Sequence, residues 1–227
     1  MSCMRLALLL LLAVPAAPAM AQVGHKPAKS PYRDILYDQN ITAYASYFDG
    51  SGGTLGIGVH NGWMYGIRYQ LRANRFISFG LGVSYGPDLE RNLIDPFAPA
   101  GERVLGPVQI RVWIPEGVLQ FNLTANKSWH RIAPYGGFGF GAGFSSTTPQ
   151  DTVYRSSVRF VFTPYAGTRL FIANNVALRL EARMPLYKIS YPLQYTEGVE
   201  PIIGTGGEWV ASGWFLAGLS YNFSLSK

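Results

Sequence analysis

Residues 209–223 read Trp-Val-Ala-Ser-Gly-Trp-Phe-Leu-Ala-Gly-Leu-Ser-Tyr-Asn-Phe, and apolar side chains occupy every second position. The odd positions, from Trp209 to Phe223, are continuously apolar, whereas the even positions are mixed and become polar toward the end. A period of two predicts a strand, and this one is longer than the usual strand of about five or six residues. Its length favours a tilted strand that crosses a bilayer with the apolar face toward lipid, although a soluble sandwich strand is an alternative from this stretch alone.

The first 21 residues have the pattern of a secretory signal peptide. Arg5 supplies a positive charge, Leu6–Val14 is a short apolar run, and Ala19-Met20-Ala21 fits a small-x-small cleavage site. Cys3 is the single cysteine of the chain, so cleavage after Ala21 leaves a protein without disulfides. We therefore expect export, and a fold held together by its core or by a membrane.

The composition narrows the class of protein. Charged residues make up 14% of the chain, well below the roughly 25% of soluble domains. Beyond the signal peptide we find no apolar run of 18 residues, so no transmembrane helix is expected. The formal net charge is +6, but no dense basic cluster accompanies it, which argues against a nucleic-acid partner. We find no Cys/His spacing typical of a metal site and expect no cofactor.

Eight stretches between residues 40 and 223 alternate in hydrophobicity as strands do. We expect strands at about Asn40–Phe48, Val59–Arg72, Arg75–Tyr85, Pro107–Ala125, Ile132–Phe144, Val158–Ala173, Val176–Ser190 and Trp209–Phe223. Residues 22–39 show no period and are expected to form a flexible leader, and residues 224–227 a short tail.

The strand at Pro107–Ala125 carries an irregularity. Its apolar side chains occupy even positions up to Ile114 and odd positions from Leu119 onward. One extra residue at Pro115-Glu116-Gly117 would restore a single apolar face, so the pattern predicts a β-bulge there.

The connections between the expected strands alternate strictly between long and short. Long external loops and short periplasmic turns are typical of an eight-stranded, antiparallel, up-and-down transmembrane β-barrel. Closure of such a barrel removes the unpaired strand edges that lipid does not tolerate. A lipocalin-like soluble barrel is the alternative fold, and it would place apolar residues inside and charged residues outside.

The end of the chain carries a further signal. Gly218, Tyr221 and Phe223 follow the order glycine, two residues, aromatic, any residue, aromatic. With the alternation over residues 40–223, the chain resembles the small eight-stranded outer-membrane β-barrel family typified by OmpX and the membrane domain of OmpA. The resemblance implies that these three residues form the assembly signal read by the barrel-insertion machinery. Two departures are Leu216, where the family prefers a polar residue, and the four residues after Phe223.

A barrel of eight strands has an interior about filled by side chains. Because the apolar faces point to lipid, the opposite faces supply a polar network in the lumen, which we expect to contain Arg68, Arg111, Arg169, Arg179, Glu181 and Arg183. Since buried charge is costly unless paired, Glu181 is expected to lie between arginines.

The favoured function is that of an integral protein of the bacterial outer membrane with a structural or surface-interaction role. The expected partners are outer-membrane lipid and lipopolysaccharide. The acidic external loops are expected to be solvated faces, and the alternative is that they meet divalent cations that bridge the anionic outer leaflet. The ligand of the external loops is not specified by the sequence.

Two alternative functions are a small channel and a lipid-A-modifying enzyme. The candidate residues for an enzyme are His60 and His130, with Ser128 beside the latter. No serine follows His60 at a motif spacing, and His130 is expected in a periplasmic turn, on the wrong side for chemistry in the outer leaflet. We therefore expect no catalytic residues.

Overall fold

The computed structural model of the chain describes residues 30–99, 102–146, 158–196, 203–204 and 206–224, and residues Tyr32–Lys227 form one compact unit. The elements are β1 (Tyr32–Asp34), β2 (Gln39–Asp49), β3 (Gly62–Arg72), β4 (Ile77–Ile94), β5 (Val104–Asn122), β6 (Lys127–Trp129), β7 (Ile132–Ser145), β8 (Arg159–Phe171), β9 (Val176–Arg183), β10 (Leu186–Ser190), α2 (Leu193–Thr196), β11 (Gly207–Ala211) and β12 (Gly213–Phe223). The predicted signal peptide lies outside the described residues. None of the described helices is long and apolar enough to cross a lipid bilayer.

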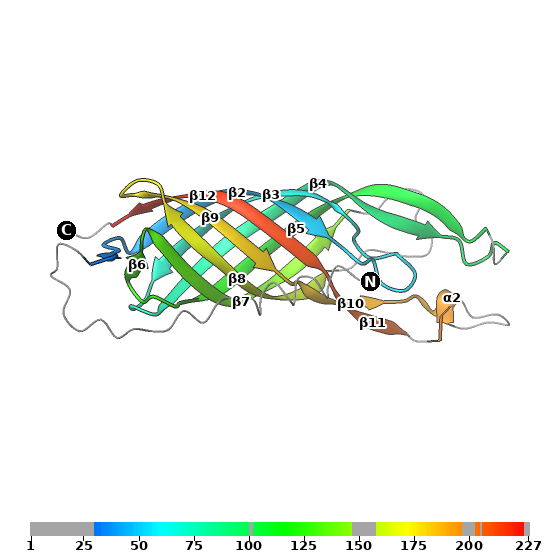
Figure 1. Cartoon of the computed structure of the whole chain (residues 1–227). Coiled ribbons are helices and arrows are strands. Elements are labelled where there is room, and N and C mark those ends of the chain that lie inside the picture. The colour runs from blue at the N-terminus through cyan, green and yellow to red at the C-terminus, as the bar shows by residue number, and fades with distance from the viewer. Residues whose placement is uncertain (1–29, 100–101, 147–157, 197–202, 205, 225–227) are drawn as a thin grey trace. The chain divides into compact units, whose positions relative to one another are not determined.

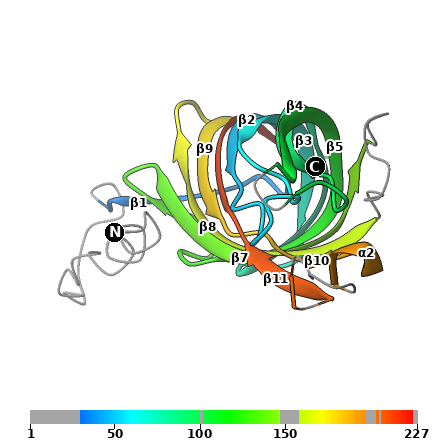
Figure 2. The ribbon, with the colours of Figure 1, turned by 90° about the vertical axis from the view of Figure 1, so that its right-hand side faces the viewer.

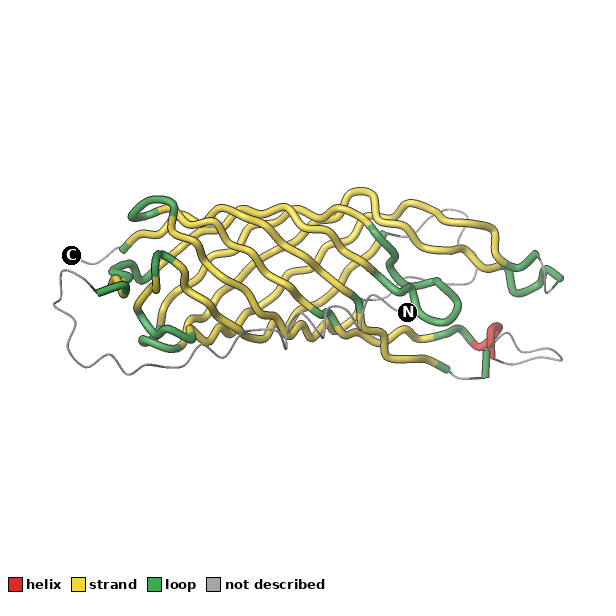
Figure 3. Tube along the Cα trace, viewed as in Figure 1, coloured by secondary structure: helices red, strands yellow, loops and turns green. Residues whose placement is uncertain are grey.

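Eight antiparallel strands close into a barrel, as the sequence predicts. Each of β2, β3, β4, β5, β7, β8 and β9 pairs with the next in this order, and β12 pairs with both β9 and β2. The tilted strands and their closure are visible in Figure 1 and Figure 3. Closure pairs the first and last long strands over Gln39–Asp49 and Gly213–Phe223, so neither retains a free edge.

The two faces of each strand are divided as the alternation predicts. On β9, the side chain of Leu180 is exposed on the outside, whereas its neighbours Arg179 and Glu181 are buried inside the barrel. On β12, Phe215 and Leu219 are exposed, and Trp214 and Ser220 are buried. The lipocalin-like alternative, with apolar residues inside and charged residues outside, is therefore wrong.

All residues of β5 are described by the structure, and the predicted β-bulge at Pro115-Glu116-Gly117 is absent from this strand. The register between β4 and β5 runs without interruption from Gly86↔Val112 to Ile77↔Phe121. Even-numbered residues of β5 point inward along this whole length, so Ile110, Val112 and Ile114 lie inside the barrel. The sequence pattern changes because the interior is apolar at one end of the strand and polar at the other.

Two hairpins that project beyond the barrel differ from the predictions. The predicted long loop at residues 86–106 is mostly a hairpin, because β4 continues to Ile94 and β5 begins at Val104. Residues 186–190 and 207–211 form a second projecting hairpin, β10–β11, which follows interruptions at Pro185 and Ser212. These hairpins extend to the right of the barrel in Figure 1.

The described part of the predicted flexible leader contains ordered structure. Tyr32–Asp34 forms β1, which pairs with β6. Ile35 is 7% exposed and packs with Ala133, Phe171 and Ala177 at the end of the barrel that carries the short turns. The sequence does not predict that this segment is ordered, because a single buried isoleucine produces no hydrophobic periodicity.

A substitution at Gly66 tests how tightly the inward-facing side chains pack, because a Cβ at this position would overlap the ring of Tyr44. The Tyr44 hydroxyl is itself hydrogen-bonded to Ser84 Oγ at 2.7 Å, so the ring is held in place. Gly66→Ala is expected to lower the free energy of unfolding by about 1–3 kcal/mol through overpacking. Urea titration of the protein in lipid vesicles, followed by heat-modifiable gel mobility, measures the change.

The matched control is Gly117→Ala on the outer face of β5, where the nearest atom to an added Cβ is 3.9 Å away. This variant is expected to keep the stability of the parent. Equal losses in both variants would contradict the assignment of faces.

Candidate functional site

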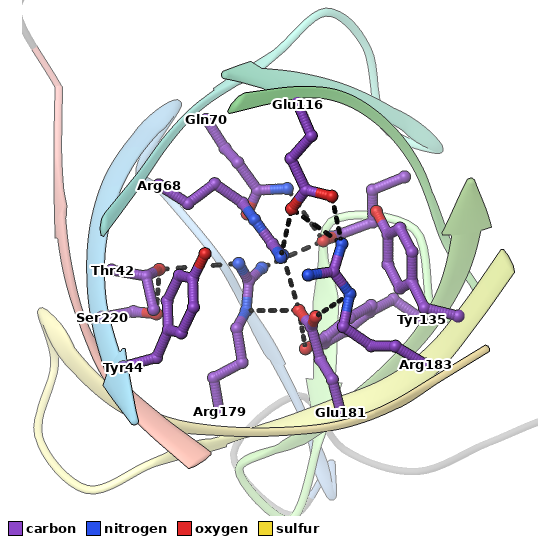
Figure 4. A network of polar contacts seen from close by, with 12 residues as sticks. Thr42, Tyr44, Arg68, Gln70, Glu116, Tyr135, Arg179, Glu181, Arg183 and Ser220 are labelled. Atoms are coloured by element: carbon purple, nitrogen blue, oxygen red, sulfur yellow. Dashed lines mark hydrogen bonds and ion pairs between the residues drawn. The ribbon is translucent and has the colours of Figure 1, made fainter. Parts of the chain in front are cut away.

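The interior of the barrel contains a cluster of charged side chains, which we call the lumen cluster. Its members are Arg68, Glu116, Arg169, Arg179, Glu181 and Arg183, and each is at most 7% exposed. They come from β3, β5, β8 and β9, whose inward faces meet across the barrel (Figure 4). Four positive and two negative charges leave a formal charge of +2 in this cluster.

Two glutamates connect the arginines. Glu181 accepts a hydrogen bond from Arg68 Nη1 at 2.8 Å, and its carboxylate lies 3.6 Å from Arg179 Nε and 3.7 Å from Arg183 Nε. Tyr135 also donates its hydroxyl hydrogen bond to Glu181, at 2.9 Å. The carboxylate of Glu181 thus lies between arginines, in the arrangement that the cost of buried charge requires.

Glu116 is the second carboxylate and was not among the residues selected from the sequence. It accepts hydrogen bonds from Arg183 Nη2 at 2.6 and 2.7 Å, and a longer one from Arg68 Nη2 at 3.3 Å. The predicted bulge is the reason that the sequence analysis missed Glu116, because a bulge at Glu116 would remove this residue from the regular alternation. Continuous counting of even positions along β5 would have placed it inside the barrel.

Arg111 does not belong to the lumen cluster. Its side chain is exposed on the outer face of β5, between the inward residues Ile110 and Val112. The prediction that Arg111 points inward is wrong for the same reason that the bulge is absent: the apolar side chains beside it fill the lumen rather than face lipid.

Arg169 on β8 and Arg179 on β9 are directly paired in register. Arg169 donates to Asn122 Oδ1 at 2.9 Å, and Arg179 donates to Gln120 Oε1 at 2.9 Å. Both guanidinium groups also lie over the ring of Tyr135, at 5.7 and 4.9 Å from its centroid. Polar amides and an aromatic face therefore stabilise Arg169, and they add to the ion pair that Arg179 makes with Glu181.

An apolar layer lies on each side of the lumen cluster. On the external side, residues including Met64, Leu89, Ile114 and Trp214 form a continuous buried cluster. A cavity of ≈ 40 Å³ remains in this layer, which is room for little more than one water molecule. On the side of the short turns, Ile35 and its three partners form a smaller apolar cluster, and buried polar side chains such as Asn40 and Asn122 share that end of the lumen.

The loop between β2 and β3, residues 50–61, covers the external opening (Figure 2). Ile57 is 1% exposed and belongs to the external apolar cluster. Glu208 on β11 holds the loop by accepting hydrogen bonds from Thr54 N at 2.5 Å and Thr54 Oγ1 at 2.8 Å. Tyr191 donates a further hydrogen bond to the same carboxylate.

The histidines lie in different surroundings. His60 shares a hydrogen bond between its Nε2 atom and the Gly56 carbonyl, at 2.7 Å, and the His130 ring contacts Trp129 edge to face. Ser128 donates to the Arg33 carbonyl at 3.4 Å. Within the described residues, neither histidine is hydrogen-bonded to a serine or a carboxylate, and no group of His, Cys, Asp or Glu is arranged to hold a metal ion.

The three residues of the suggested assembly signal lie on both faces of β12. Gly218 faces inward, where an added Cβ would lie 2.7 Å from both the Ala43 carbonyl oxygen and Tyr44 Cβ. Tyr221 is exposed on the outer face, and its ring stacks with that of Phe223 at 6.2 Å between centroids.

Glu181→Gln tests the lumen cluster. The substitution removes one negative charge from a site that already carries a positive excess, so it is expected to lower the free energy of unfolding by about 3–5 kcal/mol. The matched control is Asp38→Asn, which breaks the partly exposed ion pair with Arg72 and is expected to cost at most about 1 kcal/mol. Urea unfolding in vesicles compares the two, and equal small losses would contradict a coupled lumen cluster.

Glu208 makes the position of the β2–β3 loop dependent on pH. Burial raises the pKa of the Glu208 carboxyl, but hydrogen bonds from Tyr191 and Thr54 lower it by more, so the net pKa lies below its ordinary value. A depressed pKa means that this contact stabilises the loop above the ordinary pKa of glutamate and is lost as pH falls through the folded-state pKa. Hydrogen exchange at residues 54–60 is expected to accelerate in that acidic window.

The Glu208→Gln variant is the control, because it cannot ionise. Its exchange at residues 54–60 is expected to be faster at neutral pH than in the parent, and to lack the additional acceleration in acid. An acid acceleration that persists in this variant would assign the effect to another group.

The geometry agrees with comparisons to known proteins. The crystal structure of the outer membrane protein OprG from Pseudomonas aeruginosa matches with a TM-score of 0.54 and 12% sequence identity, covering 86% of this chain and 99% of that one. Neisserial surface protein A matches with a TM-score of 0.48 and 15% identity, covering 86% of this chain and 98% of that one. At such identity the likeness to OprG shows the fold alone.

No curated protein sequence matches the chain significantly. The model of the outer membrane protein beta-barrel domain matches residues 6–223, nearly the whole chain. The resemblance inferred from the alternation and from the end of the chain is therefore confirmed, and the chain belongs to the outer membrane protein beta-barrel family of bacteria.

Proposed function

We propose that this protein is a non-enzymatic outer-membrane barrel with a lumen closed to solutes, whose role is structural or lies in surface interaction. The observation that carries the proposal is the succession of three packed layers along the barrel axis: the external apolar cluster, the lumen cluster and the apolar cluster around Ile35. A solute that crosses this barrel would have to disrupt the external apolar cluster, a set of buried ion pairs and the packing around Ile35.

The outer surface supports a role at the membrane and at the cell surface. The apolar outer faces contact outer-membrane lipid, and the external end lies at the level of lipopolysaccharide. The last strand, with Gly218, Tyr221 and Phe223, is the segment that we propose the insertion machinery reads. On the external hairpins, exposed apolar side chains such as Phe97 and Leu193 are 81% and 66% exposed, and they offer contacts to a surface partner.

A small anion-selective channel is the second candidate function. The observation that favours it is the formal charge of +2 in the lumen cluster, which would attract anions and repel cations. A lipid-A-modifying enzyme has less support, because His60 and His130 lie in separate surroundings within the described residues.

Single-channel recording in planar bilayers tests the proposal. The folded protein is expected to insert without producing a stable unitary conductance, and a known porin added to the same bilayer provides the positive control. A reproducible conductance step with an anion-selective reversal potential would contradict the closed lumen and establish the second candidate. Intact lipid A profiles of cells that overexpress the protein test the enzyme, and an unchanged profile is expected.

A further inference from the structure

A polar cavity lies at the end of the barrel that carries the short turns. It measures ≈ 80 Å³, and its polar lining comprises Arg33, Asp34, Tyr37, Ser128, Arg131 and Asn174. These residues belong to the segment before β2, to the β6–β7 hairpin and to the turn after β8. The cavity therefore lies outside the lumen cluster, although Ile35 and Phe171 belong both to its lining and to the apolar cluster at this end.

Arg131 is held at this cavity by an unusual turn. His130 and Arg131 form the two-residue connection between Trp129 and Ile132, and their φ angles are +45° and +68°. Asparagine and glycine are favoured in such turns, so a bulky pair there is conformationally costly. The Arg131 carbonyl accepts a hydrogen bond from Phe171 N at 2.9 Å, and its Nη1 donates to the Ile172 carbonyl at 3.3 Å. The guanidinium group is thus fixed beside the turn that follows β8.

Arg33 of β1 also lines this cavity. It pairs in register with Ser128 of β6, whose hydroxyl donates to the Arg33 carbonyl. Two arginines therefore line one small cavity, and the single acidic residue in its lining, Asp34, leaves a formal charge of +1. Guanidinium groups are the donors that proteins use most for planar, charge-assisted recognition of phosphate.

Three exposed apolar or aromatic residues are sequence neighbours of the lining residues. Tyr32 precedes Arg33, Trp129 follows Ser128, and Ile172 lies between Phe171 and Ala173. Tyr32 and Trp129 are register neighbours and are 50% and 48% exposed, and Ile172 is 56% exposed. Tyrosine and tryptophan at the end of a membrane barrel mark the interface between hydrocarbon and headgroups. The short turns lie on the periplasmic side, so the cavity is at the headgroup level of the inner leaflet of the outer membrane.

We propose that this cavity binds the phosphate of an anionic phospholipid in the periplasmic leaflet, with Arg33 and Arg131 donating to the phosphate oxygens and Tyr32, Trp129 and Ile172 contacting the glycerol and upper acyl chain. The same phosphate chemistry is present in free inorganic phosphate. The aromatic and aliphatic border favours the lipid, because a free ion gains nothing from it.

The test measures which lipids remain bound to the full-length protein. The protein is reconstituted in nanodiscs of phosphatidylglycerol and phosphatidylcholine in equal amounts, and the retained lipids are counted by native mass spectrometry. The parent protein is expected to retain phosphatidylglycerol in preference to phosphatidylcholine. Loss of either arginine is expected to lower this preference about fivefold, the effect of one basic residue at an anionic interface.

The variants are chosen so that the fold survives. Arg131→Gly removes the guanidinium group and places at φ +68° the residue that prefers such a backbone, and Arg131→Lys keeps the charge. Arg33→Gln removes the second charge. Arg75→Gln is the matched control, because Arg75 is exposed in the β3–β4 turn at the same end of the barrel and does not line the cavity. Heat-modifiable gel mobility verifies that each variant is folded.

The outcomes separate the possibilities. Loss of the preference in Arg131→Gly and Arg33→Gln, with retention in Arg131→Lys and Arg75→Gln, supports the proposal. An equal loss in Arg75→Gln would assign the preference to the general charge of this end and overturn the site. Binding of inorganic phosphate without any preference between the two lipids, or an unchanged preference in the two cavity variants, would overturn the assignment to a lipid.

Discussion

A strand inside a bilayer has no water to satisfy its backbone N–H and C=O groups, and the other features of this structure depend on that constraint. Each long strand of the barrel must have a hydrogen-bonded neighbour on both sides. The pairing of β12 with β2 meets this requirement where the first and last strands come together. Once closed, the sheet has one face toward lipid and one toward a narrow interior, and every residue of a regular strand belongs to one of them.

Closure creates an energetic problem inside the barrel. A narrow interior excludes bulk water, so charged side chains that point inward need partners within the protein. Arg68 on β3 and Arg183 on β9 meet this need with Glu116 from β5 and with Glu181, which lies on β9 itself. Arg169 relies on Asn122 and on the ring of Tyr135 instead. The apolar layers on either side keep water from this cluster, which strengthens its ion pairs and makes the loss of one partner costly.

The alternation in the sequence was sufficient to predict the eight strands, the closed barrel and the inward direction of Arg68, Arg169, Arg179, Glu181 and Arg183. Two predictions are wrong because they assume that apolar residues face lipid everywhere along a strand. These are the bulge at Pro115-Glu116-Gly117 and the inward direction of Arg111. The external end of this lumen is filled by Ile110, Val112 and Ile114, so apolarity alone does not identify the lipid-facing side there.

The sequence by itself determined which residues share a face, because the period of a strand is local and needs no knowledge of its neighbours. The strand count and the alternation of loop lengths followed from the same local pattern. Only the tertiary structure decided which charges are partners, since Arg68, Glu116 and Glu181 are brought together by barrel closure and not by spacing along the chain. It also decided that Ile35 packs at one end of the barrel and that Arg33 and Arg131 line one cavity, because a segment without periodicity there meets residues about a hundred positions away along the chain.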